Sequence, residues 1–263
     1  MIERVVVPVD FTAESEWAVV PAIRFAEWSG TRVELVSVVA PSDRSQVEHR
    51  LAMLAATTGP DGADYRIIES DGPAEPALMD ELRRRPNALW CLGSHARSAV
   101  GEILRYSVSE DLVRDAHVPV VLVGPNCTAA PNGRVLAVAL DGTDQGEAIM
   151  PSALDLASSL GMTVRLLEVG DQAGALSTDC ETAQLTTAGR RVPAMAGGPI
   201  DHDVLHARHP AHELADYVAA HHEIGLVAMA TRGLSGMERL RHGGRAFDLA
   251  HRAVVPVAIA HFG

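Results

Sequence analysis

Short apolar runs alternate with amphipathic stretches along the first half of the chain. Apolar and β-branched runs predict strands at 5–9, 33–39, 65–69, 88–92 and 120–123. Apolar residues at helical spacing predict helices between them, at 15–29, 46–57, 75–85 and 107–116. This alternation is typical of an α/β domain built on a parallel sheet.

The second half repeats the same order of elements. Its strands are predicted near 135–140, 164–169, 202–206, 226–230 and 257–260. One segment differs, because residues 170–199 replace the helix of 46–57 with a stretch rich in Gly, Ala and Thr. We expect at most a short helix near 180–188 there. The segment is either a lid beside a binding crevice or an eroded helix, and the eroded helix is the simpler account.

The two halves keep register as copies of one unit. Asp10 corresponds to Asp141 and Val38 to Val169, at an offset of 131 residues. Three later pairs share an offset of 137: Pro73 with Pro210, Gly93 with Ala230, and Pro119 with Pro256. One net insertion of six residues explains both offsets, so the repeat indicates duplication. The predicted organisation is a first domain at 1–125, a linker at 126–133 and a second domain at 134–263.

Composition and charge narrow the class of protein. The chain has 22 Lys and Arg against 34 Asp and Glu, a net charge of -12, which disfavours broad binding to nucleic acid or to an anionic membrane. No apolar segment approaches the roughly 20 residues of a membrane span, and the first residues lack a signal-peptide pattern. We therefore expect a soluble, cytoplasmic protein. The cysteines Cys91, Cys127 and Cys180 show no C-x-x-C spacing, which favours reduced thiols over a disulfide framework or a zinc ribbon.

Candidate binding residues lie where the predicted strands end. Asp10 and Asp141 close the first strand of their copies, and Gly93 and Ala230 close the fourth. If the first and fourth strands are neighbours, these residues line a crevice where the strand order reverses, and open α/β sheets bind ligands at that point. The alternative for each aspartate is a helix cap. The recurrence of the aspartate in register, each time with a glycine-rich turn, favours the crevice.

The stretches after the fourth strand carry a recognisable motif. From residue 93 the first copy reads GSHARSAVGEILRYSVSEDLVRDAHVPVVLV, and from residue 230 the second reads ATRGLSGMERLRHGGRAFDLAHRAVVPVAIA. With the two aspartates and the repeat, these stretches resemble the universal stress protein family. Its ATP-binding members carry Gly, two residues, Gly, nine residues, and then Gly followed by Ser or Thr. The resemblance covers nearly the whole chain apart from the linker and 170–199.

The resemblance implies a fold and an arrangement of the two copies. The implied fold is two tandem Rossmann-like (adenine nucleotide alpha hydrolase-like) domains, each with a five-stranded parallel sheet of order 3-2-1-4-5. Single-domain relatives form homodimers, so the two copies are expected to form a pseudo-dimer through their last strands, 120–123 and 257–260. A further homodimer of whole chains, the protein partner and the stress signal stay open.

The resemblance also implies a ligand. It is an adenine nucleotide, ATP, ADP or AMP, with Mg²⁺ accompanying ATP, and some relatives bind cyclic AMP. Asp10 or Asp141 would contact the adenosine part, and Val38 or Val169 would meet the adenine ring. A helix that begins near Ser107 or Gly244 would direct its backbone N–H groups at the phosphates.

The two motifs are incomplete in different ways. In the first copy Ala96 and Tyr106 replace glycines, and the phenol of Tyr106 would occupy space that the family reserves for phosphate oxygens. The matching residues of the first copy are Gly93, Ser107, Val108 and Ser109, with Arg97 inside the loop.

The second copy lacks the first glycine, where Ala230 stands, and the hydroxyl residue, where Gly244 stands. The missing hydroxyl removes a phosphate contact worth about 1.5–3 kcal/mol. Nearby arginines, Arg232, Arg241 and Arg245, could compensate with charge. The second site is therefore the favoured one, with candidate residues Asp141, Gly142, Thr143, Val169, Ala230, Arg232, Gly233, Gly243, Gly244 and Arg245.

The sequence gives little support for a metal site. Histidines at short spacing can bind zinc or nickel, but the candidates fall on a strand, a turn and a helix, so we expect solvated surface histidines and no metal site. They are His202, His206, His209, His212, His221 and His222.

The chain also lacks a G-x-S-x-G elbow, an H-E-x-x-H motif and a Walker-type lysine. We therefore expect a binding protein, not an enzyme. The alternatives are an interaction scaffold in which both motifs have decayed, and a slow ATPase or self-phosphorylating protein.

Overall fold

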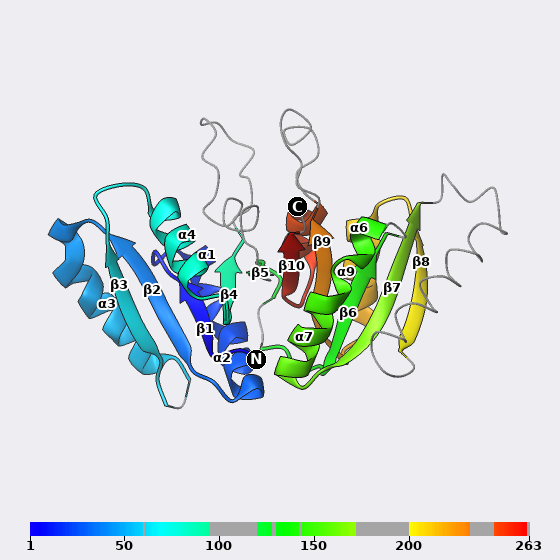
Figure 1. Ribbon diagram of the computed structural model, residues 1–263, viewed down its shortest axis with the longest axis horizontal. Coiled ribbons are helices and arrows are strands. Elements are labelled where there is room, and N and C mark those ends of the chain that lie inside the picture. Colours follow the sequence, from blue (N-terminus) through cyan, green and yellow to red (C-terminus); the bar gives the residue numbers. More distant parts are fainter. Residues whose placement is uncertain are drawn as a thin grey trace.

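Both halves of the chain fold as α/β domains (Figure 1). The computed structural model describes residues 1–59, 61–94, 120–127, 130–141, 144–171, 200–231 and 245–261. The strands of the first domain are β1 (Arg4–Pro8), β2 (Val33–Val39), β3 (Asp64–Glu69), β4 (Ala88–Gly93) and β5 (Val120–Val123). Its described helices are α1 (Ala13–Glu16), α2 (Val19–Ser29), α3 (Arg44–Thr57) and α4 (Ala74–Arg84), with a 3-10 turn at Pro41–Asp43.

The second domain repeats this order. Its strands are β6 (Val135–Leu140), β7 (Thr163–Asp171), β8 (Asp201–Ala207), β9 (Ile224–Thr231) and β10 (Val257–His261). Its described helices are α6 (Asp144–Glu147), α7 (Met150–Leu160), α9 (Pro210–Ala220) and α11 (Arg245–Arg252).

The ten strands form one sheet in the order β3-β2-β1-β4-β5-β10-β9-β6-β7-β8. Each domain therefore has the predicted order 3-2-1-4-5, with all of its strand pairs parallel. The domains meet where β5 pairs antiparallel with β10, through Val120 with Ile259 and Leu122 with Val257. This pairing confirms the predicted contact between the last strands of the two copies.

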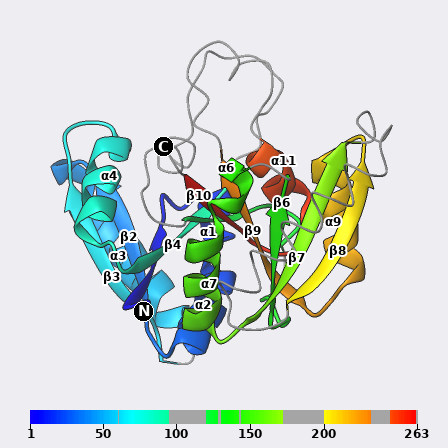
Figure 2. The same cartoon turned by 45° about the vertical axis from the view of Figure 1, so that its right-hand side comes forward.

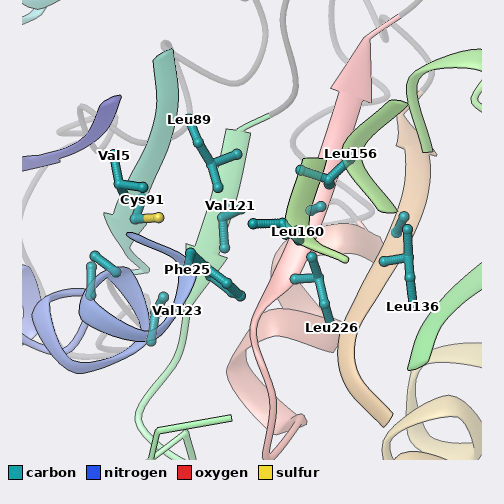
Figure 3. Packing of buried hydrophobic residues seen from close by; sticks show 14 of the residues in the cluster. Val5, Phe25, Leu89, Cys91, Val121, Val123, Leu136, Leu156, Leu160 and Leu226 are labelled. Carbon is teal, nitrogen blue, oxygen red and sulfur yellow. The ribbon is translucent and has the colours of Figure 1, made fainter. Parts of the chain in front are cut away.

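Each face of the sheet carries a core that runs through both domains. On one face α2 and α7 lie side by side across the β5–β10 pair (Figure 2). Figure 3 shows part of this core, with Phe25 and Val121 from the first domain and Leu156 from the second. On the other face α4, α9 and α11 contribute the covering side chains. Apolar runs such as β5 are buried along their whole length, because helices cover both faces of the strand.

On the α2–α7 side of the domain contact, Trp28 of the first domain packs against residues of the second domain. The ring centroid of Trp28, in α2, lies 4.4 Å from the guanidinium carbon of Arg134, just before β6. Gly225 lies beneath this indole, since a Cβ added at Gly225 would be 3.3 Å from its Cη2 atom. Arg24 adds a hydrogen bond to the linker, from Nη2 to Asn132 Oδ1 at 3.4 Å.

The helix predicted at 15–29 is two helices, so that prediction is wrong in one respect. α1 ends at Glu16 and α2 begins at Val19. Pro21 explains the break, because it has no N–H to donate to the carbonyl of Trp17 and fits the first turn of a new helix. The second domain divides α6 from α7 at the corresponding place, with Pro151 in the first turn of α7.

Two predicted helices, at 107–116 and near 180–188, lie outside the described residues. Within the part of the chain that the structure describes, no helix has the length and apolar character needed to cross a bilayer.

Candidate functional site

The predicted crevices lie at neighbouring strand ends. In the first domain β1 pairs with both β2 and β4, which places Asp10 between Val38 and Gly93. In the second domain β6 pairs with both β7 and β9, so Asp141, directly after β6, lies between the ends of those two strands. The condition for a ligand crevice at the switch point is therefore met in both copies.

Asp10 is engaged by its own loop. Its Oδ1 atom accepts hydrogen bonds from the backbone N–H and the hydroxyl of Thr12, at 3.0 and 2.6 Å. Thr12, not Asp10, is the cap of α1, because its Oγ1 accepts the N–H of Ser15 at 3.2 Å. The helix-cap alternative is therefore wrong for Asp10, because Thr12 is the residue that caps α1. Asp10 organises the turn that holds the cap.

Phe11 gives the first loop an unusual backbone. Its φ of 63° lies in the left-handed region, which a bulky side chain rarely adopts. The guanidinium carbon of Arg50, from α3, lies 4.1 Å from the centre of the Phe11 ring, close enough for a cation–π contact. The sequence analysis missed Phe11; the signal available was its position opposite Gly142 of the second copy.

Gly93 is required by packing. A Cβ at this position would lie 1.9 Å from the carbonyl oxygen of Glu14 and 3.2 Å from the Cα of Ser15. The first turn of α1 therefore rests directly on the end of β4. In the second domain α6 also contacts β9, where Ala230 stands in place of the glycine.

Asp141 contacts the short helix of its own domain. A Cβ added at Gly146, in α6, would lie 2.4 Å from Asp141 Oδ1 and 3.3 Å from its Cγ. The carboxylate of Asp141 therefore rests against the bare Cα of Gly146. Asp141 remains exposed to solvent, while Gly146 is buried.

Sequence comparison identifies the family. The sequence model of the universal stress protein family matches residues 1–124 and 133–261. The chain belongs to the universal stress protein family. No curated protein matches the sequence.

Solved structures share the tandem fold of this universal stress protein. One is a universal stress protein from Archaeoglobus fulgidus DSM 4304, with a TM-score of 0.73 and 17% identity over 99% of this chain and 98% of that chain. Another is a functionally unknown protein from Pseudomonas aeruginosa PAO1, with a TM-score of 0.63 and 16% identity over 99% of this chain and 92% of that chain. At these identities the likeness concerns the fold.

Most of the predicted phosphate loop of this universal stress protein lies outside the described residues. Those loop positions are Arg97, Ser107, Val108, Ser109, Arg232, Gly233, Gly243 and Gly244, and the candidates Gly142 and Thr143, which follow Asp141, lie outside as well. Arg245 is the first residue of α11. The adenine candidates Val38 and Val169 are half-buried and pack against the core on the α4 and α9 side of the sheet. Their contact with a base stays a prediction.

The histidines are spread over separate elements. His202 Nε2 lies 3.6 Å from Glu168 Oε2, and the ring centroids of His209 and His212 lie 5.7 Å apart. His221 stacks on Tyr217 with ring centroids 3.9 Å apart. Among the described residues, no three His, Cys, Asp or Glu side chains gather so that they could hold a metal ion.

The cysteines within the described ranges belong to the core. Cys91 is fully buried in β4, and burial raises the pKa of its thiol. Cys127, in the linker, is also buried, which raises its pKa to about 12. Both thiols are therefore protonated and unreactive at neutral pH. Cys180 lies outside the described residues.

Proposed function

We propose that this universal stress protein binds an adenine nucleotide, ATP, ADP or AMP, in the crevice of its second domain. Mg²⁺ would accompany ATP, bound through the phosphates. The chain acts as a binding protein without rapid turnover, and the bound nucleotide favours one conformation for a protein partner. The first domain is a degenerate copy of the site.

The place of Asp141 in the fold supports this assignment. Asp141 directly follows β6, beside the switch point between β6 and β9. Its carboxylate lies against Gly146 of α6. A carboxylate there can accept a hydrogen bond from a nucleoside hydroxyl or amino group. The sequence adds a second reason, because Tyr106 of the first copy corresponds to Gly243 of the second.

The test is calorimetric titration of ATP and AMP, with and without Mg²⁺, into protein stripped of co-purified nucleotide. We expect one site per chain. Asp141→Ala should abolish it, and Gly243→Tyr should do the same by bringing the first copy's tyrosine into the second loop. Asp10→Ala is the matched control and should leave the stoichiometry unchanged.

The alternatives give different results in the same titration. No heat up to millimolar nucleotide would favour an interaction scaffold in which both motifs have decayed. Two sites per chain, or loss of binding in Asp10→Ala alone, would contradict the assignment of the second domain. Steady release of phosphate that disappears in Asp141→Ala would replace the binding protein with a slow ATPase.

A further inference from the structure

The contact between the domains is asymmetric on its α2–α7 side. These two helices correspond in the repeat and lie side by side across the junction (Figure 2). α2 carries Trp28, whose indole reaches the second domain. α7 carries Ser159 at the corresponding position, 131 residues later. Two copies of one helix therefore bring very different side chains to the same junction.

The second domain receives Trp28 on three residues, which we call the cradle: Gly133, Arg134 and Gly225. A Cβ at Gly225 would lie 2.1 Å from the carbonyl oxygen of Gly133 and 3.3 Å from Cη2 of Trp28, so two bare backbones leave room for the indole. The guanidinium carbon of Arg134 lies 4.4 Å from the ring centroid, close enough for a cation–π contact. Its Nη1 donates to the carbonyl of Leu160 at 2.8 Å, which orients the guanidinium from within the second domain.

The backbone of the second domain is also irregular at the cradle. Val135 of β6 pairs with Ile224, whereas the next residue of β6 pairs with Leu226. Gly225 is therefore the extra residue of a β-bulge. In the first domain three consecutive residues of β1 pair with three consecutive residues of β4, and Ala88 stands at the position of Gly225. The bulge thus belongs to the copy that receives the tryptophan.

A pair of two first domains would lack the cradle. The cradle positions correspond to Ile2, Glu3 and Ala88 in the first copy. Trp28 would meet two added side chains and a carboxylate in place of the guanidinium. The face of an aromatic ring is negative, so it attracts a cation and repels a carboxylate. A pair of two second domains would set Ser159 against the cradle, and this side chain is too short to fill it.

We propose that Trp28 and the cradle determine which domains pair. The surface formed by β5 and α2 fits a second domain, which in this structure is that of the same chain, and discriminates against another first domain. Every molecule then combines one crevice of each copy. This inference concerns the pairing of the domains and does not depend on nucleotide binding.

The test uses the full chain with a protease site inserted between Cys127 and Pro131 and cut after folding. The two fragments are then held together only by the domain contact. They differ in mass, so native mass spectrometry distinguishes unlike pairs from like pairs. After incubation long enough for exchange, we expect unlike pairs only. Like pairs of either fragment, or free fragments alone, would overturn the inference.

Variants on both sides of the contact test its residues. Trp28→Ser, which introduces the residue of α7, should raise the dissociation constant of the cut fragments about 10- to 100-fold, because apolar burial and the cation–π contact are lost. Arg134→Glu introduces the charge of Glu3 and should weaken the pair in the same direction. Ser159→Ala is the matched control and should leave the dissociation constant unchanged. Wild-type affinity in Trp28→Ser would overturn the inference.

A double-mutant cycle separates pairing from damage within one domain. Such damage is a concern because Trp28 also contacts Phe25, with ring centroids 5.8 Å apart. If Trp28 and Arg134 act on each other, Arg134→Glu should weaken the pair less in the Trp28→Ser background than in the wild type. Equal losses in the two backgrounds would show that these residues do not determine the pairing together, which contradicts the proposal.

Discussion

Two pairs of corresponding residues show how the copies have diverged at the scale of single side chains. Asp10 and Asp141 share a place at the end of the first strand: the Oδ1 atom of Asp10 accepts hydrogen bonds from Thr12, and that of Asp141 lies against Gly146. Gly93 and Ala230 share a place at the end of the fourth strand, yet only the first has helix backbone where its Cβ would be. The role of a residue in the motif therefore depends on the side chains and backbone that it contacts in its own domain. The glycine at 93 is required by its packing against α1.

Gly93→Ala should destabilise the first domain. The new Cβ would meet the carbonyl oxygen of Glu14 at 1.9 Å, and backbone cannot rotate aside as a side chain can. Overpacking of this kind costs about 1–3 kcal/mol in the free energy of unfolding. Ala230→Gly is the matched change in the second domain and should cost at most about 1 kcal/mol. Urea denaturation of both variants would contradict this account if Gly93→Ala were as stable as the wild type.

At the scale of elements, a buried charge cluster fixes α4 on the sheet. Glu34 of β2 and Glu81 of α4 are both buried, and Arg85 joins them, with Nη1 2.6 Å from Glu34 Oε2 and Nη2 2.7 Å from Glu81 Oε1. Arg66 of β3 also contacts both carboxylates, at 3.2 and 3.3 Å. Burial acts to lower the pKa of Arg85, but the hydrogen bonds and charges of the two glutamates outweigh it and the pKa is raised.

The second domain inverts two of these charges. Arg165 stands at the position of Glu34, and Asp203 at that of Arg66. Arg165 pairs with Glu223 at 2.8 Å, and the hydroxyl of Tyr217 donates to Asp203 at 2.5 Å. Each domain therefore has a polar cluster beside its corresponding helix, α4 in the first and α9 in the second, but the charges are arranged differently.

Arg85→Met should destabilise the first domain strongly. The variant leaves the two buried carboxylates with two arginines, Arg66 and Arg84, whose own side chains are largely exposed. Removing one partner of a buried ion pair costs about 3–5 kcal/mol. Arg83→Met is the control, because the Arg83–Asp80 pair is exposed on both sides and should contribute at most about 1 kcal/mol. Equal unfolding midpoints for the two variants would show that the cluster does not stabilise α4.

At the scale of the whole molecule, the two domains share one sheet and one core on each face. The last strands β5 and β10 lie at the centre of this sheet, while β3 and β8 lie at its edges. Because β5 and β10 are central and buried, these two strands cannot separate without exposing apolar surface of both domains. We therefore expect the β5–β10 contact between the domains to be among the last parts of the structure to unfold.

Hydrogen exchange of the native protein tests this expectation. The paired amides of β5 and β10 should be among the slowest to exchange, at a rate set by global unfolding. Amides of the edge strands β3 and β8 should exchange earlier through local opening. Exchange at the β5–β10 pair as fast as at the edges would show that the domains open independently.

The fold could largely be predicted from the sequence, and the local chemistry could not. Strand positions and order followed from apolar runs and from the family resemblance, because a buried strand needs side chains suited to both covered faces. The break between α1 and α2 was missed, although Pro21 was the signal for it. Asp141 was identified as a site residue, but its contact with Gly146 was not, since that contact depends on where the tertiary structure places the carboxylate.

The sequence by itself therefore determined the duplication, the α/β class and the end of the strands at which a ligand crevice would lie, because periodicity and repeat register are properties of the chain. Only the tertiary structure decided that Asp10 serves its own turn, that Gly93 serves packing and that Asp141 lies on Gly146. These distinctions arise from contacts a few ångströms long. Such contacts depend on where neighbouring backbone lies, and no pattern along one copy specifies that.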